Sequence, residues 1–378
     1  MDPTTTHQLN IAFDAKRAYL NYRGLGNYCR TLLRQLSALY PENTYWLCTP
    51  QDPGDYPWLN QTPFRKIAPS GLWKISPSLW RRAGISSALQ DAKIDIYHGL
   101  SQELPAHIRR LGCRTVVTMH DAIYLRYPEL YSPTYVWAFT QKNKQACREA
   151  DCIVAISEQT KRDYIEFFHV PEEKIRVIYQ GCHPIFWENA SEEHDWQVIA
   201  NYNLPSEYIL SVGALEARKN ALRILQGMAE AHIDLPLVLV GRGNPSYVQQ
   251  LQRSAETLHI RLILIQNARH QDLPSIYRKA SVFVFPSLFE GFGIPILEAA
   301  RCGVPVVASS GTCFEEICQE AALYVNPLRP DAIGNAIRRY LDDTSLRQQM
   351  SAQALVNTER FRQEKVAAEM MALYQSLV

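Results

Sequence analysis

Two acidic residues in the second half of the chain bracket a turn that suits an anionic ligand. Glu290 and Glu298 stand eight positions apart in the stretch SVFVFPSLFEGFGIPILEAARCGVPVV, where a buried strand precedes a glycine turn and a helix. The helix is expected to begin near Ile294, and the free N–H groups of a first helical turn bind anions. Gly291 and Gly293 allow the backbone to approach such an anion closely. For Glu298, an ordinary acid stabilised by the helix dipole is an equal alternative, whereas Glu290 has no evident packing role.

Two adjacent cations in the segment ILSVGALEARKN indicate the kind of anion. The strand in this segment ends at Gly213, and Arg218 and Lys219 follow in a short loop before a helix. Arginine offers a planar fork of donors and lysine a point charge, and this combination suits a diphosphate. A solvated basic pair at a helix start is the alternative, but cations there oppose the helix dipole. We therefore expect an anionic ligand that offsets the repulsion.

The first half of the chain carries weaker signals of the same kind. The loop RGLGN places Gly24 and Gly26 between the first strand and a helix, but it lacks the third glycine of a dinucleotide-binding fingerprint. His120 ends the strand in VVTMHD, at a sheet edge where functional loops gather. A histidine in such a place is as often structural as catalytic.

Residues 64–82, FRKIAPSGLWKISPSLWRR, interleave aromatic and basic side chains. Trp73 and Trp80 stand among the cations Arg65, Lys66, Lys74, Arg81 and Arg82. This combination is typical of a contact with an anionic membrane surface. A helix with packed tryptophans and solvated cations is an equal alternative.

Short apolar runs alternate with longer segments of helical period, which predicts the elements that position these residues. In the first half we expect strands at 11–14, 45–49, 95–98, 115–120 and 152–157, and helices at 27–39 and 135–149. After a polar stretch at 188–203, we expect strands at 208–213, 236–241, 261–266, 281–286, 304–308 and 322–325, and helices at 220–231, 245–257 and 272–279.

This alternation predicts an α/β fold with two Rossmann-like, doubly wound domains facing a cleft. We assign residues 1–190 to the first domain, 191–360 to the second, and 361–378 to a C-terminal helix that packs back on the first domain. In such sheets ligands bind beyond the carboxyl ends of the strands, where the loops described above lie.

The composition restricts the functional class. The chain has 378 residues, enough for two domains, and its net charge of +1 argues against a nucleic-acid-binding protein. Nine cysteines form no C-x-x-C pair, so neither a disulfide framework nor a metal site is expected. A basic leader and a run of about 18 apolar residues are both lacking. We therefore expect a reducing, cytoplasmic compartment.

Four segments together resemble one enzyme family. EGFGIPILE, GALEARKN, HDAIYLRYPELYSP and ADCIVAISEQTKRDYIEFFHVPEEKIRVIYQG are similar to the retaining GT-B glycosyltransferases of family 4, and the likeness covers nearly the whole chain. It implies that the first domain binds the acceptor and the second domain a nucleotide sugar. The sequence departs from the usual pattern in NAR at 267–269, in EE at 315–316 and in FRQEK at 361–365.

The resemblance implies roles for individual residues. The implied catalytic residues are His120, Arg218, Lys219 and Glu290: the two cations bind the diphosphate, Glu290 binds the donor sugar, and His120 lies at the sugar from the opposite domain. Glu298 binds the ribose hydroxyls, and the backbone that follows Glu290 binds the sugar. The implied donor-binding set is Gly24, Gly26, Gly213, Phe292, Gly293, Ile294 and Glu298.

The resemblance also implies the reaction, a transfer of a hexose with retention of configuration. Cations and a helix N-terminus answer the charge that grows on the diphosphate, so neither a metal nor a cofactor is expected, and no D-x-D motif occurs. DIYHGLSQELP and HDAIYLRYPELYSP look most like bacterial mannosyltransferases of surface-polysaccharide synthesis. We therefore predict GDP-mannose as the donor and a glycan or lipid-linked acceptor, with the enzyme at the inner face of the membrane if residues 64–82 bind lipid.

Three alternatives remain. The donor is UDP-glucose or UDP-N-acetylglucosamine, the chain is another enzyme on the same scaffold such as an epimerase or a phosphorylase, or it is an inactive protein that binds a nucleotide sugar.

Overall fold

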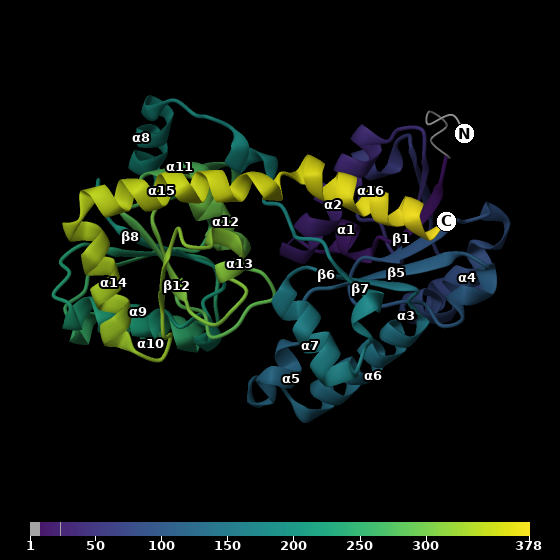
Figure 1. Ribbon diagram of the computed structural model, residues 1–378, viewed down its shortest axis with the longest axis horizontal. Coiled ribbons are helices and arrows are strands. Elements are labelled where there is room, and N and C mark those ends of the chain that lie inside the picture. The colour runs from purple at the N-terminus through teal and green to yellow at the C-terminus, as the bar shows by residue number, and fades with distance from the viewer. Residues whose placement is uncertain (1–7, 23) are drawn as a thin grey trace. The chain divides into compact units, whose positions relative to one another are not determined.

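A computed structural model describes residues 8–22 and 24–378 of the chain. The chain forms two compact units (Figure 1): the first comprises Met1–Gly181 and Gln363–Val378, and the second Cys182–Arg362. The sequence placed the corresponding boundaries at 190 and 360. Each unit contains one parallel sheet of its own with helices against it.

The sheet of the first unit has seven parallel strands in the order β3-β2-β1-β4-β5-β6-β7. Their bounds are β1 Asn10–Asp14, β2 Thr44–Cys48, β3 Phe64–Ile67, β4 Ile96–Gly99, β5 Arg114–Met119, β6 Cys152–Ala155 and β7 Ile175–Val177. The strand order changes direction between β1 and β4. Open parallel sheets bind ligands at such a switch point, beyond the carboxyl ends of the two strands.

Helices bury both faces of this sheet. Their bounds are α1 Lys16–Leu20, α2 Gly24–Leu39, α3 Pro77–Leu79, α4 Ile85–Ala88, α5 Ile123–Arg126, α6 Pro133–Glu149, α7 Glu158–Phe168 and α16 Gln363–Leu377. Successive residues of β1 point to opposite faces, because the side-chain period of a strand is two. Ile11 and Phe13 pack in the cluster that contains α2 and α16, whereas Ala12 belongs to the cluster that contains α6.

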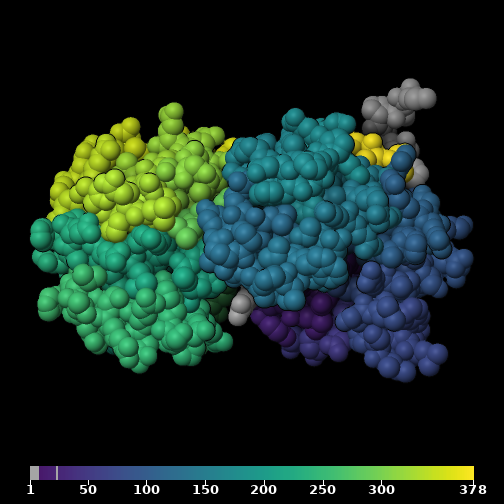
Figure 2. All heavy atoms as spheres, turned by 90° about the horizontal axis from the view of Figure 1, so that it is seen from below, coloured from purple at the N-terminus to yellow at the C-terminus, as the bar shows by residue number. Residues whose placement is uncertain are grey.

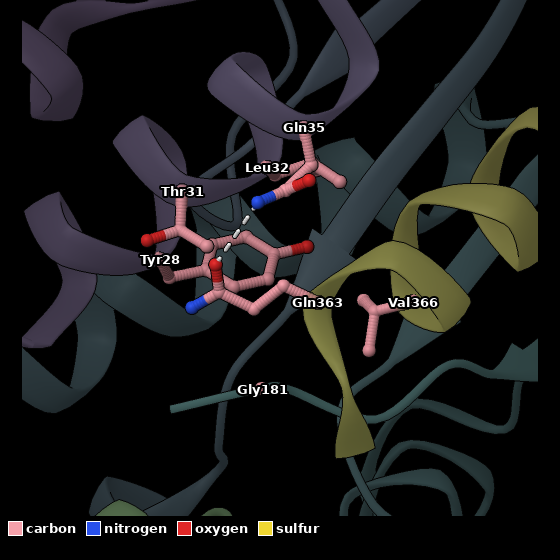
Figure 3. Close-up of a pocket in the computed structure, with 7 residues that line it drawn as sticks. All are labelled: Tyr28, Thr31, Leu32, Gln35, Gly181, Gln363 and Val366. Atoms are coloured by element: carbon pink, nitrogen blue, oxygen red, sulfur yellow. Dashed lines mark hydrogen bonds between the residues drawn. The ribbon is translucent and has the colours of Figure 1, made fainter. Parts of the chain in front are cut away.

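The last helix of the chain belongs to the first unit, although it follows the second unit in sequence. In Figure 1, α16 is yellow and lies beside the purple α2, and the same yellow borders the blue surface of the first unit in Figure 2. Met370, Met371 and Tyr374 are buried in the same core cluster as Ile11. Figure 3 shows the amide of Gln35 donating to Gln363 across this contact at 3.4 Å, beside a cavity of about 10 Å³. That volume holds no more than a water molecule, so the contact is a packing interface.

The sheet of the second unit has six parallel strands in the order β10-β9-β8-β11-β12-β13. They are β8 Ile209–Val212, β9 Leu237–Val240, β10 Leu262–Ile265, β11 Val282–Phe285, β12 Val306–Ser309 and β13 Leu323–Val325. The helices are α8 Glu192–Asn201, α9 Ala221–Glu230, α10 Pro245–Thr257, α11 Leu273–Arg278, α12 Ile294–Arg301, α13 Glu315–Cys318, α14 Pro330–Asp342 and α15 Thr344–Thr358. Here the switch point lies between β8 and β11.

Eleven of the strands were predicted from the sequence, and two were not. The first missed strand, β3, begins residues 64–82, so that segment is not one helix: a strand is followed by the 3₁₀ turn η2 (Gly71–Ile75), α3 and the π-type turn η3 (Trp80–Gly84). The second, β7, is a three-residue edge strand. Both lie at an edge of the sheet, where a strand pairs on one side only and its sequence is less apolar.

Among the residues that the structure describes, no helix combines the length and apolar character needed to cross a membrane.

Candidate active site

The switch point of the second unit brings together the cations and one of the acids singled out in the sequence. Arg218 and Lys219 lie in the 3₁₀ turn η9 (Ala217–Lys219), which follows β8. Glu290 lies in the loop that follows β11. A backbone hydrogen bond of 2.9 Å from the Leu288 N–H to the Arg218 carbonyl joins the two loops. Residues some seventy positions apart therefore meet at the edge where a parallel sheet binds ligands.

Both cations bind the same oxygen of Glu290. The Nη1 of Arg218 lies 2.7 Å from Oε1 and the Nζ of Lys219 lies 2.5 Å from it, while the Ser287 hydroxyl donates to it at 2.6 Å. These three ionised side chains are 14–17% exposed. Among the described residues, none donates a hydrogen bond to the other oxygen, Oε2. One face of the carboxylate is thus held by cations, and the other is open to a further donor such as a sugar hydroxyl.

The charges of this cluster fix its protonation. Burial raises the pKa of Glu290, but the charges of Lys219 and Arg218 outweigh that effect and leave the pKa below its usual value. Glu290 is therefore ionised at neutral pH. No ligand is needed to offset the repulsion that the two cations experience at the helix start, contrary to the expectation from the sequence. Glu290 offsets it within the protein, and Glu216 adds a second contact to Arg218 at 2.6 Å.

Asn220 holds the cations in place, a role that the sequence analysis missed. It is buried, adopts a left-handed backbone with φ of 66°, and forms the N-cap of α9. Its side-chain amide donates to the carbonyls of Pro286 at 3.0 Å and Pro327 at 2.6 Å. Asparagine is among the few residues other than glycine that adopt this conformation readily. The triplet RKN thus contains two cations and the residue that fixes their loop.

The turn after Glu290 depends on its glycine. Gly293 has φ of 117°, and a Cβ atom there would lie 2.9 Å from the ring of Phe314. The thiol of Cys313 donates to the carbonyl of Phe292 at 2.9 Å, which fixes the backbone that leads into α12. As predicted, α12 begins at Ile294 and has a proline in its first turn. The N–H groups of that turn follow directly after the acid.

Glu298 lies in the second turn of α12 and is buried, with 9% of its surface exposed. The Tyr277 hydroxyl donates to its Oε2 at 2.9 Å. Burial raises the pKa of Glu298 to about 8, and the hydrogen bond from Tyr277 only partly opposes this. Glu298 is therefore not an ordinary exposed acid at a helix start: in the folded protein it is a neutral carboxyl group at pH 7.

His120 lies in the first unit and is also buried. Its Nε2 contacts the Leu100 carbonyl at 2.9 Å, and its Nδ1 lies 3.2 Å from the amide nitrogen of Gln180. These partners assign the proton to Nε2, because a carbonyl only accepts and an amide NH₂ only donates. Burial lowers the pKa of His120 to about 4, so the ring is neutral at pH 7.

Gly24 and Gly26 do not form a loop, contrary to the sequence analysis. Both lie in the first turn of α2, and Arg23, the first residue of the expected loop, lies outside the described residues. A Cβ atom on Gly26 would lie 1.7 Å from the Asn21 carbonyl oxygen, whereas one on Gly24 would meet nothing within 4 Å. Close packing of the chain before the helix therefore explains Gly26.

Comparisons with known proteins agree with this architecture. Residues 22–184 match Glycosyltransferase Family 4, and residues 193–355 match Glycosyl transferases group 1. The O-antigen chain mannosyltransferase B of Escherichia coli is 32% identical over 77% of this chain and 76% of its own length. The chain belongs to this glycosyltransferase family.

Two further proteins are similar to this chain, and the similarity covers a different share of each. The serotype-specific mannosyltransferase WbdA of Escherichia coli is 30% identical over 70% of this chain. The match covers 34% of the length of WbdA. The crystal structure of Anabaena Alr3699/HepE in complex with UDP superposes with a TM-score of 0.76 at 17% identity, over 98% of this chain and all of that one. The fold of this glycosyltransferase is therefore GT-B, as predicted.

The aromatic and basic segment of the glycosyltransferase is divided between core and surface. Trp80 is buried, and Arg81 pairs with Asp14, so neither matches the predicted membrane contact. Leu72 and Ile75 are more than four-fifths exposed, and Leu79 is half exposed. We call these three residues the apolar patch. Of the two tryptophans predicted to contact lipid, Trp73 is 37% exposed and Trp80 is buried, while the exposed aliphatic residues of this segment were not predicted.

Proposed function

We propose that this glycosyltransferase moves mannose from GDP-mannose to a growing surface polysaccharide, with retention of configuration. The observation that carries the proposal is the cluster of Arg218, Lys219 and Glu290 at the switch point of the second unit. The choice of mannose is supported by the two Escherichia coli relatives, both of which are named mannosyltransferases.

The cluster suits the departure of a nucleoside diphosphate. As the bond between the sugar carbon and the phosphate oxygen breaks, the bonding electrons stay with the phosphate, and its negative charge increases. Arg218 and Lys219, already fixed by Glu290, answer that charge without rearranging, which is the condition for electrostatic catalysis. The acceptor hydroxyl attacks the same face of the sugar, and its proton passes to the departing phosphate. Oε2 of Glu290 binds a hydroxyl of the donor sugar.

Glu298 binds the ribose hydroxyls in this proposal. Its buried position and its hydrogen bond with Tyr277 leave one carboxyl oxygen to receive a ligand hydroxyl. A buried acid with a single hydrogen-bond partner among the described residues gains from a second polar contact, because unmet hydrogen-bonding capacity is costly away from water. Asn267, where the sequence departs from the family pattern, is proposed to affect recognition of the nucleotide base. Its Oδ1 accepts a hydrogen bond from Arg242 at 2.8 Å.

A panel of donors tests the proposal. Purified protein is incubated with GDP-mannose, UDP-glucose and UDP-N-acetylglucosamine, and release of nucleoside diphosphate is measured together with thermal stabilisation by GDP and UDP. Turnover of GDP-mannose and stabilisation by GDP are expected, since a ligand that binds only the folded state raises its stability. Consumption of a UDP sugar alone would replace mannose by another hexose. Binding without turnover, in the presence of an oligosaccharide acceptor, would indicate an inactive sugar-nucleotide-binding protein.

The reaction is proposed to need no metal ion. Two cations and the first turn of α12 supply the positive field that a divalent ion would otherwise supply. Turnover is therefore expected to persist in excess EDTA. A loss of turnover in EDTA that Mn²⁺ or Mg²⁺ restores by titration would contradict the site as described.

The enzyme is proposed to act in the cytoplasm, bound peripherally to the membrane through the apolar patch. Exposed aliphatic side chains beside cations favour an anionic lipid surface, because the apolar groups enter the interface while the cations meet the headgroups. Four cations of the same segment are exposed: Arg65, Lys66, Lys74 and Arg82.

A further inference from the structure

The first unit contains a cavity of about 480 Å³ at its own switch point. Asp14, which ends β1, lines it together with Lys16 and Arg17 of α1, while Glu103 follows β4 and lines the same cavity. These are the two strands between which the order of the sheet changes direction. The cavity therefore occupies the place where an open parallel sheet binds its ligand.

The charges that line this cavity are strongly unbalanced. Five basic side chains face two acidic ones, which leaves an excess of three positive charges, and the basic residues are Lys16, Arg17, Arg81, Arg82 and Lys142. Arg81 occupies both acids. It binds the Asp14 carboxylate at 2.8 and 3.0 Å and Oε2 of Glu103 at 2.7 Å.

Lys142 also contacts Glu103, with its Nζ 3.5 Å from Oε1. Three cations therefore remain at the cavity without an acid of their own among the described residues: Lys16, Arg17 and Arg82. The Nε of Arg17 is buried and has no hydrogen-bond partner among them. A buried, unmet donor on a charged group is costly, and a bound anion would remove that cost. Burial lowers the pKa of Lys16, and the neighbouring charges of Arg81 and Arg17 add to that effect.

The rim of the cavity is apolar on one side. Trp137 of α6 lines it and is 68% exposed. Ser78 and Arg82 line it as well, and Leu79 of the apolar patch lies between them in sequence. A ligand that enters here contacts cations beyond the carboxyl end of β1 and apolar surface beside them.

From these observations we infer that the cavity binds a phosphate or diphosphate ester carried by the acceptor. The inference rests on the proposed function, since it names the chemical class of the molecule that receives the sugar. Arginine recognises phosphate oxygens with its paired N–H groups, and lysine adds a mobile point charge. Two sources share this chemistry, a lipid diphosphate and a water-soluble sugar phosphate, and the apolar rim favours the lipid.

Calorimetry on the full chain tests the inference. Geranyl diphosphate and glucose 1-phosphate are titrated separately into protein that has been saturated with GDP, or with UDP if that nucleotide binds instead, so that the donor site does not take up the probe. The variants are Arg17→Gln and Arg82→Gln, which remove one charge each without breaking the Arg81 ion pairs. Arg110→Gln is the matched control, because Arg110 is an exposed arginine of the same unit that does not line the cavity.

At least one probe is expected to bind the parent, and Arg17→Gln and Arg82→Gln are each expected to weaken it about tenfold, the loss of one charged hydrogen bond. Arg110→Gln should bind like the parent. Tighter binding of geranyl diphosphate identifies a lipid acceptor, and tighter binding of glucose 1-phosphate a soluble one. If neither probe binds, or if all three variants bind alike, the inference is wrong. Nucleotide affinity, measured in the same variants, should be unchanged, so a failure of donor binding is recognised separately.

Discussion

The two sheets of this glycosyltransferase have the same kind of site at their switch points, but the charged side chains are balanced in one site and unbalanced in the other. At the β8/β11 switch point, Arg218 and Lys219 share one carboxylate oxygen of Glu290. At the β1/β4 switch point, Arg81 takes both acids, and Lys16, Arg17 and Arg82 are left in excess. The first arrangement is nearly neutral, and the second carries several unbalanced positive charges.

Under the function and the inference proposed above, this difference suits each site to a different use of an anion. Cations that are held by a carboxylate are rigid before the ligand arrives, which is the requirement for stabilising charge that develops during a reaction. Cations that lack an acidic partner gain most from a ligand that already carries its charge, which is the requirement for binding. The same topology thus supplies a site suited to catalysis in one unit and a site suited to recognition in the other.

Replacing Glu290 is expected to have the largest effect on this comparison. Glu290→Gln leaves Lys219 without an acid and Arg218 with Glu216 alone, and breaking an ion pair that is mostly buried costs about 3–5 kcal/mol of stability. A nucleoside diphosphate would then supply the missing negative charge. We therefore expect a lower melting temperature and a larger stabilisation by nucleoside diphosphate than in the parent, with sharply reduced turnover of the sugar donor.

Thermal unfolding over a titration with nucleoside diphosphate measures both effects of Glu290→Gln. Glu256→Gln is a suitable control, because Glu256 is an exposed acid on α10 of the same unit. If the Glu290 variant melts like this control and responds to the nucleotide as the parent does, the cluster does not hold the cations for a diphosphate.

The cations themselves give the next largest effect. Arg218→Ala or Lys219→Ala should lower turnover by about 10²–10³, because one electrostatic contact to the departing charge is lost. Donor binding should weaken much less, since the charge on the diphosphate is greatest in the transition state. Steady-state kinetics with calorimetry of donor binding separates the two. Arg253→Ala, an exposed arginine on α10, is the control, and equal activity in all three variants would refute the assignment.

Most of the site at the β8/β11 switch point could be predicted from the sequence, and little of the cavity at the β1/β4 switch point. The E-x7-E spacing and the RKN triplet pointed to the second switch point because short local motifs stand directly after its strands. Ser287 was missed although it is only three residues from Glu290, and Asn220 and Tyr277 were missed since they act through hydrogen bonds to carbonyls or side chains distant in sequence. Such a contact is fixed by the fold and leaves no local pattern.

The cavity of the first unit could not be predicted for a related reason. Its cations come from α1, from η3 and from α6, three segments with no shared motif. Arg81 and Arg82 are adjacent in sequence, yet Arg81 forms an ion pair with Asp14 and Arg82 is exposed. The alternation of strands and helices predicted the sheets well, because both faces of a parallel sheet are buried and require apolar runs.

The pH dependence of stability sharpens the contrast within the second unit, where Glu290 is ionised and Glu298 is neutral. Burial raises the pKa of Glu298 from 4.5 to about 8, so the folded protein holds a proton that the unfolded chain releases. The resulting stability is complete below pH 4.5 and is lost as the pH rises to 8, by about 1.4 kcal/mol per pH unit. Glu298→Gln cannot lose that proton, so its stability should fall less over this range.

Urea unfolding of parent and variant at pH 5, 6, 7 and 8 measures this difference, with Glu256→Gln again as the control. Parallel curves for the parent and Glu298→Gln would mean that Glu298 is not neutral in the folded protein. Nucleoside diphosphate binding to Glu298→Gln, expected to be weaker by about two- to tenfold for the loss of one neutral hydrogen bond of about 0.5–1.5 kcal/mol, tests its contact with the ribose independently.

The smallest expected effect concerns the apolar patch, because lipid binding is proposed for the first unit and not for the second. Leu72 and Ile75 of the first unit are 85% and 82% exposed, and Leu328 is an exposed leucine of the second unit, at 57%. Entry of one aliphatic side chain into an interface contributes about 1.5 kcal/mol, the low end for full burial. Leu72→Ser or Ile75→Ser should therefore weaken binding to phosphatidylglycerol vesicles about tenfold, and Leu328→Ser should not change it.

Sedimentation with vesicles at low and at high salt measures both contributions, because salt screens the attraction of Lys74 and Arg82 to the lipid and leaves the aliphatic contribution intact. Equal sedimentation of all three variants would remove the patch from the lipid contact, and the phosphate ester at the cavity would then be more simply a soluble one.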